Sequence, residues 1–336
     1  MNLPIVLTMG EPAGVGGEIA FKAWLLRREI SAPFFLIDDP ARLTALAARV
    51  GLDVPVVAID APEQAAAIFA KALPVLPLPL PGPSEPGRLN PVNAGAVVES
   101  IDRAVALVRA RRAGAVVTNP IHKYALREAG FRYPGHTEYL AHLAGPEFTP
   151  VMMLAGRGLR VVPVTIHMAL TAAIAALDTA GIVACGRATA MALTSDFGIE
   201  APRLAVAALN PHGGEGGIMG REEIDIIAPA VVILRREGIT ALGPAPADTL
   251  FHEGARAGYD AVLCMYHDQA LIPLKTVDFA GGVNVTLGLP FVRTSPDHGT
   301  ALDIAGTGRA DATSLIAALT LAAEMAARRA SHPDGG

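Results

Sequence analysis

The sequence predicts a three-layer α/β/α protein, in which a mainly parallel sheet is covered by helices on both faces. Short apolar runs alternate with longer segments of helical periodicity along almost the whole chain, as in successive β-strand and α-helix units. Hydrophobic residues make up 51% of the 336 residues, enough for a substantial core. Glycines, prolines and polar side chains cluster directly after the apolar runs, where a parallel sheet places its ligand sites.

The predicted strands are short apolar runs bounded by turn residues. They span residues 3–8, 34–37, 56–59, 115–118, 151–154, 159–165, 203–209 and 261–265. The runs 151–154 and 159–165 flank a turn that contains two glycines, so we expect these two strands to pair with each other.

The predicted helices carry apolar residues at helical spacing. They span residues 18–26, 40–50, 93–112, 138–143, 170–196, 222–237 and 312–328. Asp39 and Asp311 are predicted N-terminal caps, and Pro40 suits the first turn of its helix. We expect the segment 170–196 to be two helices that break near Gly181.

Residues 74–91 contain seven prolines. Because proline lacks a backbone N–H and has a fixed φ, this segment is predicted to form neither a helix nor a central strand. We interpret it as an extended surface connection within the fold.

Composition argues against several classes of protein. The net charge is −5 and no long basic run is present, so we expect no nucleic-acid partner. There is no apolar run of about 18 residues and no signal-peptide pattern, so we expect a cytoplasmic protein without a membrane partner. The two cysteines, Cys185 and Cys264, lie in apolar surroundings and are predicted to be small core residues outside any disulfide framework.

A glycine-rich loop, residues 10–17, joins the first predicted strand to the first helix. Such a loop can turn backbone N–H groups toward an anion. The Rossmann fingerprint is incomplete, because Ile19 stands where its third glycine would be. A ligand-binding loop and a simple tight turn both remain open at this position.

The densest group of polar residues follows the predicted strand 261–265. Glycines and prolines separate these residues, which suits a ligand-binding edge of the sheet, although a run of solvated loops is the alternative. The group comprises Tyr266, His267, Asp268, Gln269, Lys275, Asp278, Asn284, Arg293, Asp297, His298 and Asp303.

Three histidines each follow a predicted strand closely. His167 follows 159–165, His212 follows 203–209 and His267 follows 261–265. The carboxyl ends of parallel strands share one edge, so the three imidazoles could converge on a catalytic divalent metal, zinc above all. Their spacing is not a recognised local metal signature, so three unrelated histidines are the alternative.

Candidate phosphate ligands also occur. His136 and Thr137 follow a Pro-Gly turn at a predicted helix start, where the positive helix end favours an anion, although Thr137 could be an ordinary cap. Arg293 could form a bidentate contact and Lys275 could act as a point charge, although each could also be an ordinary surface residue.

Several segments, in order over nearly the whole chain, are specific as a set. They are 10–16 (GEPAGVG), 119–123 (NPIHK), 135–138 (GHTE), 209–217 (LNPHGGEGG), 246–251 (PADTLF), 266–269 (YHDQ) and 293–301 (RTSPDHGTA). Together they resemble the 4-hydroxythreonine-4-phosphate dehydrogenase family of pyridoxal phosphate biosynthesis. Residues 298–306 (HGTALDIAG) also resemble the cofactor loop of isocitrate and isopropylmalate dehydrogenases, which bind NAD(P) without a Rossmann fingerprint.

The resemblance implies a fold of that type, with two subdomains around a cleft. Residues 1–132 and 280–336 would form the cofactor-side subdomain, and residues 133–279 the subdomain for metal, substrate and dimerisation. It also implies a homodimer with a shared active site, in which His267 reaches the metal bound by His167 and His212 of the other subunit.

The resemblance further implies the roles of individual residues. The metal, Zn²⁺, Mg²⁺ or Co²⁺, would be bound by His167, His212 and His267. The phosphorylated substrate would be bound by His136, Thr137, Lys275, Asn284 and Arg293. NAD or NADP would be bound at Gly299, Asp303 and Gly306. Asp248 and Asp268 match acidic site residues of the family, and the candidate general base is Lys275 or Asp268.

The implied reaction is the oxidation of 4-phosphohydroxy-L-threonine to 2-amino-3-oxo-4-phosphohydroxybutanoate, which decarboxylates to 3-amino-2-oxopropyl phosphate. A related dehydrogenase of 4-phosphorylated threonate or erythronate would carry the same metal and phosphate residues. A metal-dependent lyase or phosphohydrolase and a non-catalytic phosphometabolite-binding protein are the alternatives in other classes.

Overall fold

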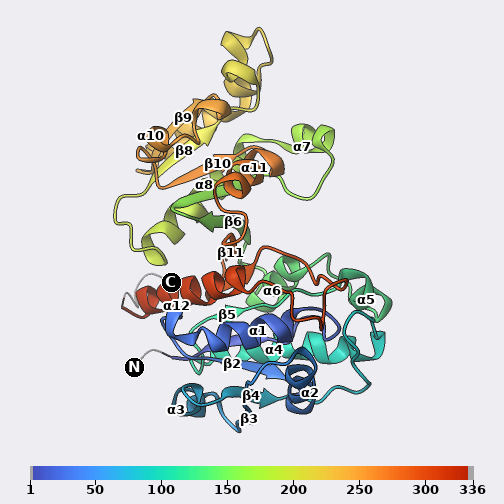
Figure 1. The fold of residues 1–336 in the computed structure, drawn as a ribbon. Coiled ribbons are helices and arrows are strands. Elements are labelled where there is room, and N and C mark those ends of the chain that lie inside the picture. The colour runs from blue at the N-terminus through green and yellow to red at the C-terminus, as the bar shows by residue number, and fades with distance from the viewer. Residues whose placement is uncertain (1–2, 332–336) are drawn as a thin grey trace. The chain divides into compact units, whose positions relative to one another are not determined.

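The computed structural model describes residues 3–331, which divide into two compact units. Of these residues, 3–150 and 289–331 form the first unit, and Val151–Gly288 forms the second. Helix α12 (Thr313–Ser331), red in Figure 1, packs beside the blue strand β1 (Ile5–Thr8), so segments from opposite ends of the chain build the first unit.

The first unit contains a parallel sheet in the order β3-β4-β2-β1-β5-β12. Its strands are β3 (Val56–Ala58), β4 (Leu73–Pro77), β2 (Phe34–Asp38), β1, β5 (Val116–Val117) and β12 (Arg293–Pro296). Its helices are α1 (Gly16–Leu25), α2 (Pro40–Val50), α3 (Ala65–Phe69), α4 (Ala94–Arg109), α5 (Lys123–Glu128), α6 (His136–Ala144) and α12.

Helices cover both faces of this sheet, so the residues of β1, β2, β5 and β12 are buried on both sides. On one face, Val6, Phe35 and Ile37 join a core cluster with residues of α4 and α6. On the other, α1 packs against α2 and α12, and α12 contacts β1, β5 and β12. Asp39 and Asp311 accept backbone N–H groups at the starts of α2 and α12, as predicted.

Strand β4 corrects the prediction for the proline-rich segment. Leu73–Pro77 pairs in parallel with both β3 and β2, so it is an inner strand. Its prolines, Pro74 and Pro77, lie near its two ends. Ladder bonds still form from Leu73 N–H to the Pro55 carbonyl and from Ile59 N–H to the Val75 carbonyl, each at 2.8 Å. Because a proline near a strand end removes few ladder hydrogen bonds, β4 can form despite its two prolines.

The second unit has a mixed sheet in the order β11-β6-β7-β10-β8-β9. The β11–β6 and β6–β7 pairs are antiparallel, which confirms the predicted pairing around residues 155–158, and the other pairs are parallel. The strands are β11 (Val283–Leu287), β6 (Val151–Gly156), β7 (Leu159–Pro163), β10 (Ala261–Cys264), β8 (Arg203–Ala207) and β9 (Thr240–Ala245).

Helices also cover both faces of this second sheet. Residues of α11 form a core with β7, β8 and β10, whereas α8 packs with α9 and contacts β6, β8 and β10. The break predicted near Gly181 lies at Leu177–Asp178, because the Asp178 side chain accepts the Gly181 N–H and caps α8. The helices are α7 (Leu170–Ala176), α8 (Thr179–Ser195), α9 (Ala228–Arg236), α10 (Glu253–Arg256) and α11 (His267–Val277), with a π-helix at Glu223–Ile227 before α9.

Helix α6 and strand β11 lie in different units from those that the implied subdomain boundaries assign to them. Helix α6 lies in the first unit, because Tyr139 and Leu140 pack in the α4 core. Strand β11 lies in the second unit, because it pairs along its length with β6. His136 and Thr137 thus share a unit with Arg293.

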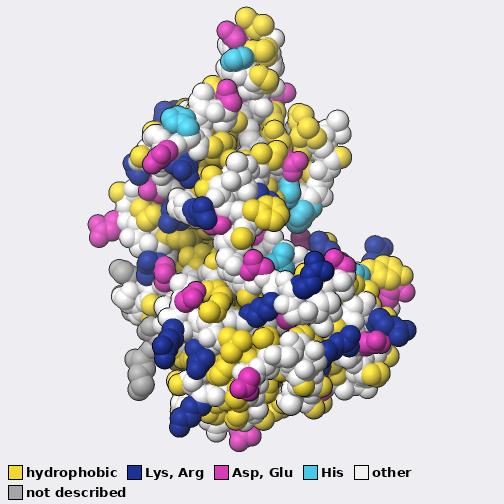
Figure 2. Space-filling model, in the orientation of Figure 1, with side chains coloured by type: hydrophobic (Ala, Val, Ile, Leu, Met, Phe, Trp, Pro, Cys, Tyr) yellow, Lys and Arg dark blue, Asp and Glu magenta, His cyan; other side chains and the backbone are white. Residues whose placement is uncertain are grey.

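The surface carries charges of both signs, and the two cysteines are buried. Figure 2 shows acidic and basic side chains interspersed over the displayed face of each unit. Cys185 and Cys264 are buried and unbridged, as predicted. Among residues 3–331, no single helix has the length and apolarity needed to cross a membrane; α7 and α8 meet those criteria only as a pair bent by 90°.

Candidate active site

The three histidines of the predicted metal site follow three neighbouring parallel strands of the second unit. His167 follows β7, His267 starts α11 directly after β10, and His212 follows β8. Because β10 pairs in parallel with both β7 and β8, the three loops leave the same edge of the sheet. The sheet topology therefore places the loops as the sequence predicts.

The side chains form a pair rather than a triad within one chain. The rings of His167 and His267 lie 5.7 Å apart between centroids. In the part of the chain that the structure describes, no group of three or more histidine, cysteine or acidic side chains could hold a metal ion. Within the described residues, a single chain therefore does not assemble the predicted three-histidine metal site.

Asp268 orients His267. The Nδ1 atom of His267 lies 2.7 Å from Oδ1 of Asp268. This contact engages Nδ1 of the ring and leaves Nε2 outside it. Asp268 is therefore engaged with His267, and Lys275 and Asp268 both remain predicted candidates for the general base.

His212 lies in a loop with an unusual backbone. Residues 212–216 all have positive φ, and His167 shares this conformation at φ 48°. The carboxylate of buried Glu223 fixes the loop, because its Oε1 accepts the N–H groups of Leu209 and Asn210 at 2.8 and 2.7 Å. A Cβ at Gly214 would come within 2.6 Å of the same carboxylate, so glycine is required there.

The other predicted residues of the second unit are more dispersed. Lys275 lies in the last turn of α11, with Nζ 5.3 Å from the centre of the Phe279 ring. Asn284 lies on β11, and its buried Oδ1 has no hydrogen-bond partner within residues 3–331. Asp248 is exposed in a short 3₁₀ turn after β9. Of these three, Asn284 has the buried acceptor that a ligand could satisfy with a hydrogen bond.

The predicted phosphate residues of the first unit gather at the start of α6. His136 and Thr137 are its first two residues, where the positive helix end favours an anion. Arg293 opens β12, is 3% exposed and donates from Nη2 to Oγ1 of Thr118 at 2.6 Å. Nε2 of His136 is buried and has no hydrogen-bond partner in the described part of the chain.

Burial and two nearby cations shape the pKa values at this site. Burial, with the positive charges of Arg293 and Lys123, holds the pKa of His136 well below its ordinary value. Burial also lowers the pKa of Arg293 to about 10, so its guanidinium stays charged at neutral pH. A neutral histidine, a buried cation and a helix N-terminus together favour a phosphate group.

The lowered pKa of His136 predicts a loss of stability in mild acid. Below its ordinary pKa of about 6.5 the unfolded chain binds a proton at this residue and the folded protein does not, so unfolding becomes easier as pH falls. Protonation of this residue can lower the free energy of unfolding by at most about 1.4 kcal/mol for each pH unit. The free energies of unfolding of wild type and His136→Gln should be measured from pH 8 to pH 5. The two values should converge as the pH falls, and curves that stay parallel would contradict the prediction.

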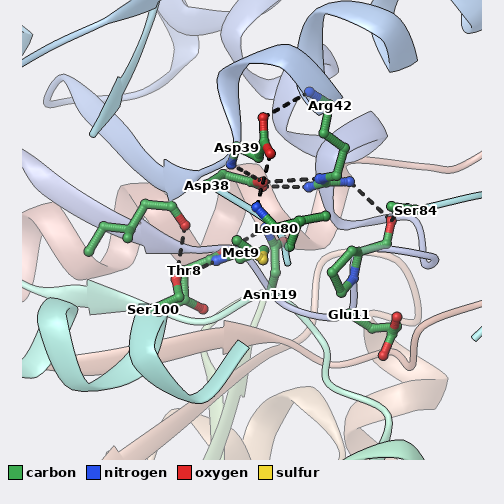
Figure 3. Close-up of polar contacts among 12 residues, drawn as sticks. Thr8, Met9, Glu11, Asp38, Asp39, Arg42, Leu80, Ser84, Ser100 and Asn119 are labelled. Carbon is green, nitrogen blue, oxygen red and sulfur yellow. Dashed lines mark hydrogen bonds and ion pairs between the residues drawn. The ribbon is translucent and has the colours of Figure 1, made fainter. Parts of the chain in front are cut away.

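The glycine-rich loop forms a tight turn, and Figure 3 draws Glu11 of this loop together with Asn119, whose Nδ2 donates to the Thr8 carbonyl at 3.0 Å. The N–H of Glu11 donates to the Pro120 carbonyl at 2.8 Å, and that of Val15 to the Thr300 carbonyl at 3.0 Å. Gly10 has φ 68°, and a Cβ there would lie 2.6 Å from Cβ of Asn119. The glycines therefore serve close packing, and these two N–H groups are already used within the protein.

The three predicted cofactor residues lie on the loop 298–310 of the first unit. Gly299 and Asp303 are exposed, and a Cβ added at Gly299 would meet nothing within 4 Å. Gly306 has φ 72°, and a Cβ there would meet Pro86 at 2.6 Å. Glycine is thus required by packing at Gly306, whereas Gly299 leaves open space in which a ligand could lie.

The sequence did not reveal the residues that support these sites. Lys123 lowers the pKa of His136 and lies near Gly135, but its segment only matched a family motif. Buried Glu223 and Glu18 bind distant backbone, and neither stands in a pattern that marks such a role. The Glu18 contact joins residues 292 apart and the Glu223 contact residues 14 apart, both beyond the spacing that helix or strand periodicity reports.

Comparison with known proteins identifies the family. Residues 29–322 match the family described as pyridoxal phosphate biosynthetic protein PdxA. A 4-hydroxythreonine-4-phosphate dehydrogenase of Caulobacter vibrioides is 55% identical over 331 residues, covering 97% of this chain and 98% of that protein.

Solved structures agree with this match. A crystal structure of 4-hydroxythreonine-4-phosphate dehydrogenase from Klebsiella pneumoniae has a TM-score of 0.87 and 38% identity, covering 97% of this chain and 98% of the other. A terephthalate 1,2-cis-dihydrodiol dehydrogenase from Burkholderia xenovorans has a TM-score of 0.65 and 30% identity, covering 96% and 98%. By full-length similarity, the chain belongs to the pyridoxal phosphate biosynthetic protein PdxA family, whose relatives carry the name of a dehydrogenase.

Proposed function

We propose that the protein oxidises 4-phosphohydroxy-L-threonine with NAD or NADP as the hydride acceptor, in the biosynthesis of pyridoxine 5'-phosphate. The names of its relatives suggest this substrate. The observation that carries the proposal is the electropositive site at the start of α6, where His136 has a buried, unsatisfied Nε2 close to the charge of Arg293. Such a site suits the phosphate that distinguishes this substrate.

In this proposal the phosphate anchors the substrate. Nε2 of His136 and the N–H groups at the start of α6 bind its oxygens, with Thr137 supplying a hydroxyl and Arg293 a guanidinium. Asn284, whose Oδ1 lacks a partner among the described residues, takes a donor group of the substrate. Fixing the substrate at several points orients its C3 hydroxyl for reaction.

The chemistry needs a base, a hydride acceptor and stabilisation of negative charge. Lys275 is the proposed base for the C3 hydroxyl, because Asp268 already binds His267. When bound, a nicotinamide would supply the hydride acceptor, and a divalent ion (Zn²⁺, Mg²⁺ or Co²⁺) held by the histidines would lower the pKa of the substrate hydroxyl. The oxidised product is a β-keto acid, which decarboxylates to 3-amino-2-oxopropyl phosphate.

The active site is proposed to be shared within a homodimer. One chain brings two imidazoles, His167 and His267, to 5.7 Å and leaves His212 outside that pair. Two imidazoles on one tetrahedral ion have centroids roughly 5 Å apart, given metal–nitrogen distances of about 2.0 Å. A twofold partner supplies the missing ligand and creates two equivalent sites.

Removal of metal is expected to abolish the dehydrogenase activity. Purified protein incubated with 4-phosphohydroxy-L-threonine and either cofactor should form NAD(P)H. A chelator should stop the reaction, and Zn²⁺, Co²⁺ or Mg²⁺ should restore it. Because the ligands must be neutral imidazoles, metal affinity should fall as pH drops through roughly 7 to 6. Full activity in metal-free protein would exclude the metal, and no NAD(P)H with either cofactor would reject the proposed function.

A further inference from the structure

Helix α1 carries a carboxylate that the proposed reaction does not use. Glu18 is fully buried in the first turn of this helix. Its Oε2 accepts the N–H of Gly306 at 3.1 Å, and its Oε1 accepts the N–H of Ala310 at 2.9 Å. Burying a carboxylate is costly unless hydrogen bonds compensate it, and here both oxygens bind backbone of the 298–310 loop.

Lys22 binds the same stretch one turn further along α1. Its Nζ donates to the Gly308 carbonyl at 2.8 Å and also to the Ala310 carbonyl. Nζ lies 3.8 Å from Oε1 of Glu18, so the two charges compensate each other. Together the two side chains bind the N–H groups of Gly306 and Ala310 and the carbonyls of Gly308 and Ala310.

The β1–α1 segment also holds the beginning of this loop. The N–H of Val15 donates to the Thr300 carbonyl at 3.0 Å, and a Cβ at Gly14 would lie 2.9 Å from that same oxygen. The loop is therefore fixed at both ends to one helix and its preceding turn. Between and beside these anchors, Gly299 and Asp303 are exposed.

From this geometry we infer that Glu18 and Lys22 are positioning residues for the nicotinamide cofactor. They hold the 298–310 loop in its binding conformation before the cofactor arrives, so that binding does not have to order the loop. This inference rests on the proposed function, because that function makes the loop a cofactor site. Neither side chain needs to touch the cofactor.

The test compares Glu18→Gln with wild-type protein in three measurements. A glutamine keeps the size but has only one acceptor oxygen, so one backbone N–H loses its partner. NADH and NADPH affinity should fall about tenfold, the binding of inorganic phosphate should not change, and amide exchange in residues 306–310 should speed up. In turnover, the KM for NAD(P) should rise while kcat at saturating cofactor stays near wild type.

Matched variants distinguish a specific effect on the loop from a general loss of folding. Lys22→Met removes two contacts from a side chain that is partly exposed, whereas Lys22→Arg keeps a cation and should recover most of the affinity. Glu29→Gln makes the same charge change at an exposed site after α1 and should behave as wild type. If Glu18→Gln does not fold, the two Lys22 variants decide the question.

The outcomes separate this inference from the proposed function. Wild-type protein that binds neither dinucleotide would reject the proposed function and the inference with it. Dinucleotide affinity that is normal in both Glu18→Gln and Lys22→Met would overturn the positioning role alone. Equal losses of dinucleotide and phosphate binding would also overturn it, because they would show general damage.

Discussion

The Arg293→Ala variant is expected to show a substrate KM about 30- to 150-fold above that of wild type, with little change in the KM for NAD(P). Arg293 is buried at the start of β12, and its charge lowers the pKa of His136, so its charge acts at the proposed phosphate site. A charge-assisted contact with a phosphate contributes about 2–3 kcal/mol. Steady-state KM values, measured separately for substrate and cofactor, check this result.

Two companion variants separate binding from folding. Arg293→Lys keeps the positive charge but cannot form a bidentate contact with the phosphate. Its substrate KM should therefore lie between those of wild type and Arg293→Ala. Thr118→Val removes the acceptor that lies 2.6 Å from Nη2 and should leave the substrate KM within a few-fold of wild type. Thermal unfolding of each variant should be measured first, because Arg293 is buried. An unchanged substrate KM in a folded Arg293→Ala protein would remove Arg293 from the site.

Mixing His212→Ala with His267→Ala is expected to restore activity from two inactive proteins. The resemblance assigns His267 to the partner subunit, whereas the structure pairs His167 with His267 in one chain and so makes His212 the other candidate. In both arrangements, one site of a mixed dimer has neither substitution. Random exchange makes half the dimers mixed, so about a quarter of all sites should regain activity.

The His167→Ala variant then shows which histidine crosses the interface. Recovery with His267→Ala would mean that His267 comes from the partner, and recovery with His212→Ala would mean that His212 does. The control is each variant alone, subjected to the same exchange treatment. If exchange is confirmed by mass spectrometry and no pair recovers, each site is built within one chain and the shared site is rejected.

The fold could be predicted from the sequence where the signal is local. Apolar runs such as 261–265 mark strands regardless of their partners, and the parallel pairing of β7, β10 and β8 then places the three histidine loops at one edge. Strand β4 escapes prediction because it overlaps the segment 74–91, whose seven prolines argue against a central strand. What matters is the position of Pro74 and Pro77 near the strand ends, and only the pairing of β4 reveals it.

The candidate site was predicted residue by residue but not as an arrangement. His136 and Arg293 come from distant parts of the chain, and only the folded unit shows that Arg293 and Lys123 lower the pKa of His136. The positive φ of His212 follows from its anchored loop and has no local sequence signal. Contacts of this kind depend on packing between segments that do not adjoin in the sequence.

Substrate choice is the central claim, and the fold alone does not decide it, since a dihydrodiol dehydrogenase shares this fold. The most direct measurement is kcat/KM, with NAD(P)H formation as the readout, for 4-phosphohydroxy-L-threonine, 4-phosphorylated threonate or erythronate, and unphosphorylated 4-hydroxythreonine. We expect the highest value for 4-phosphohydroxy-L-threonine, with one carbon dioxide released per NAD(P)H, and a value at least about 30-fold lower without the phosphate. A higher value for the threonate or erythronate, or equal values with and without the phosphate, would contradict it.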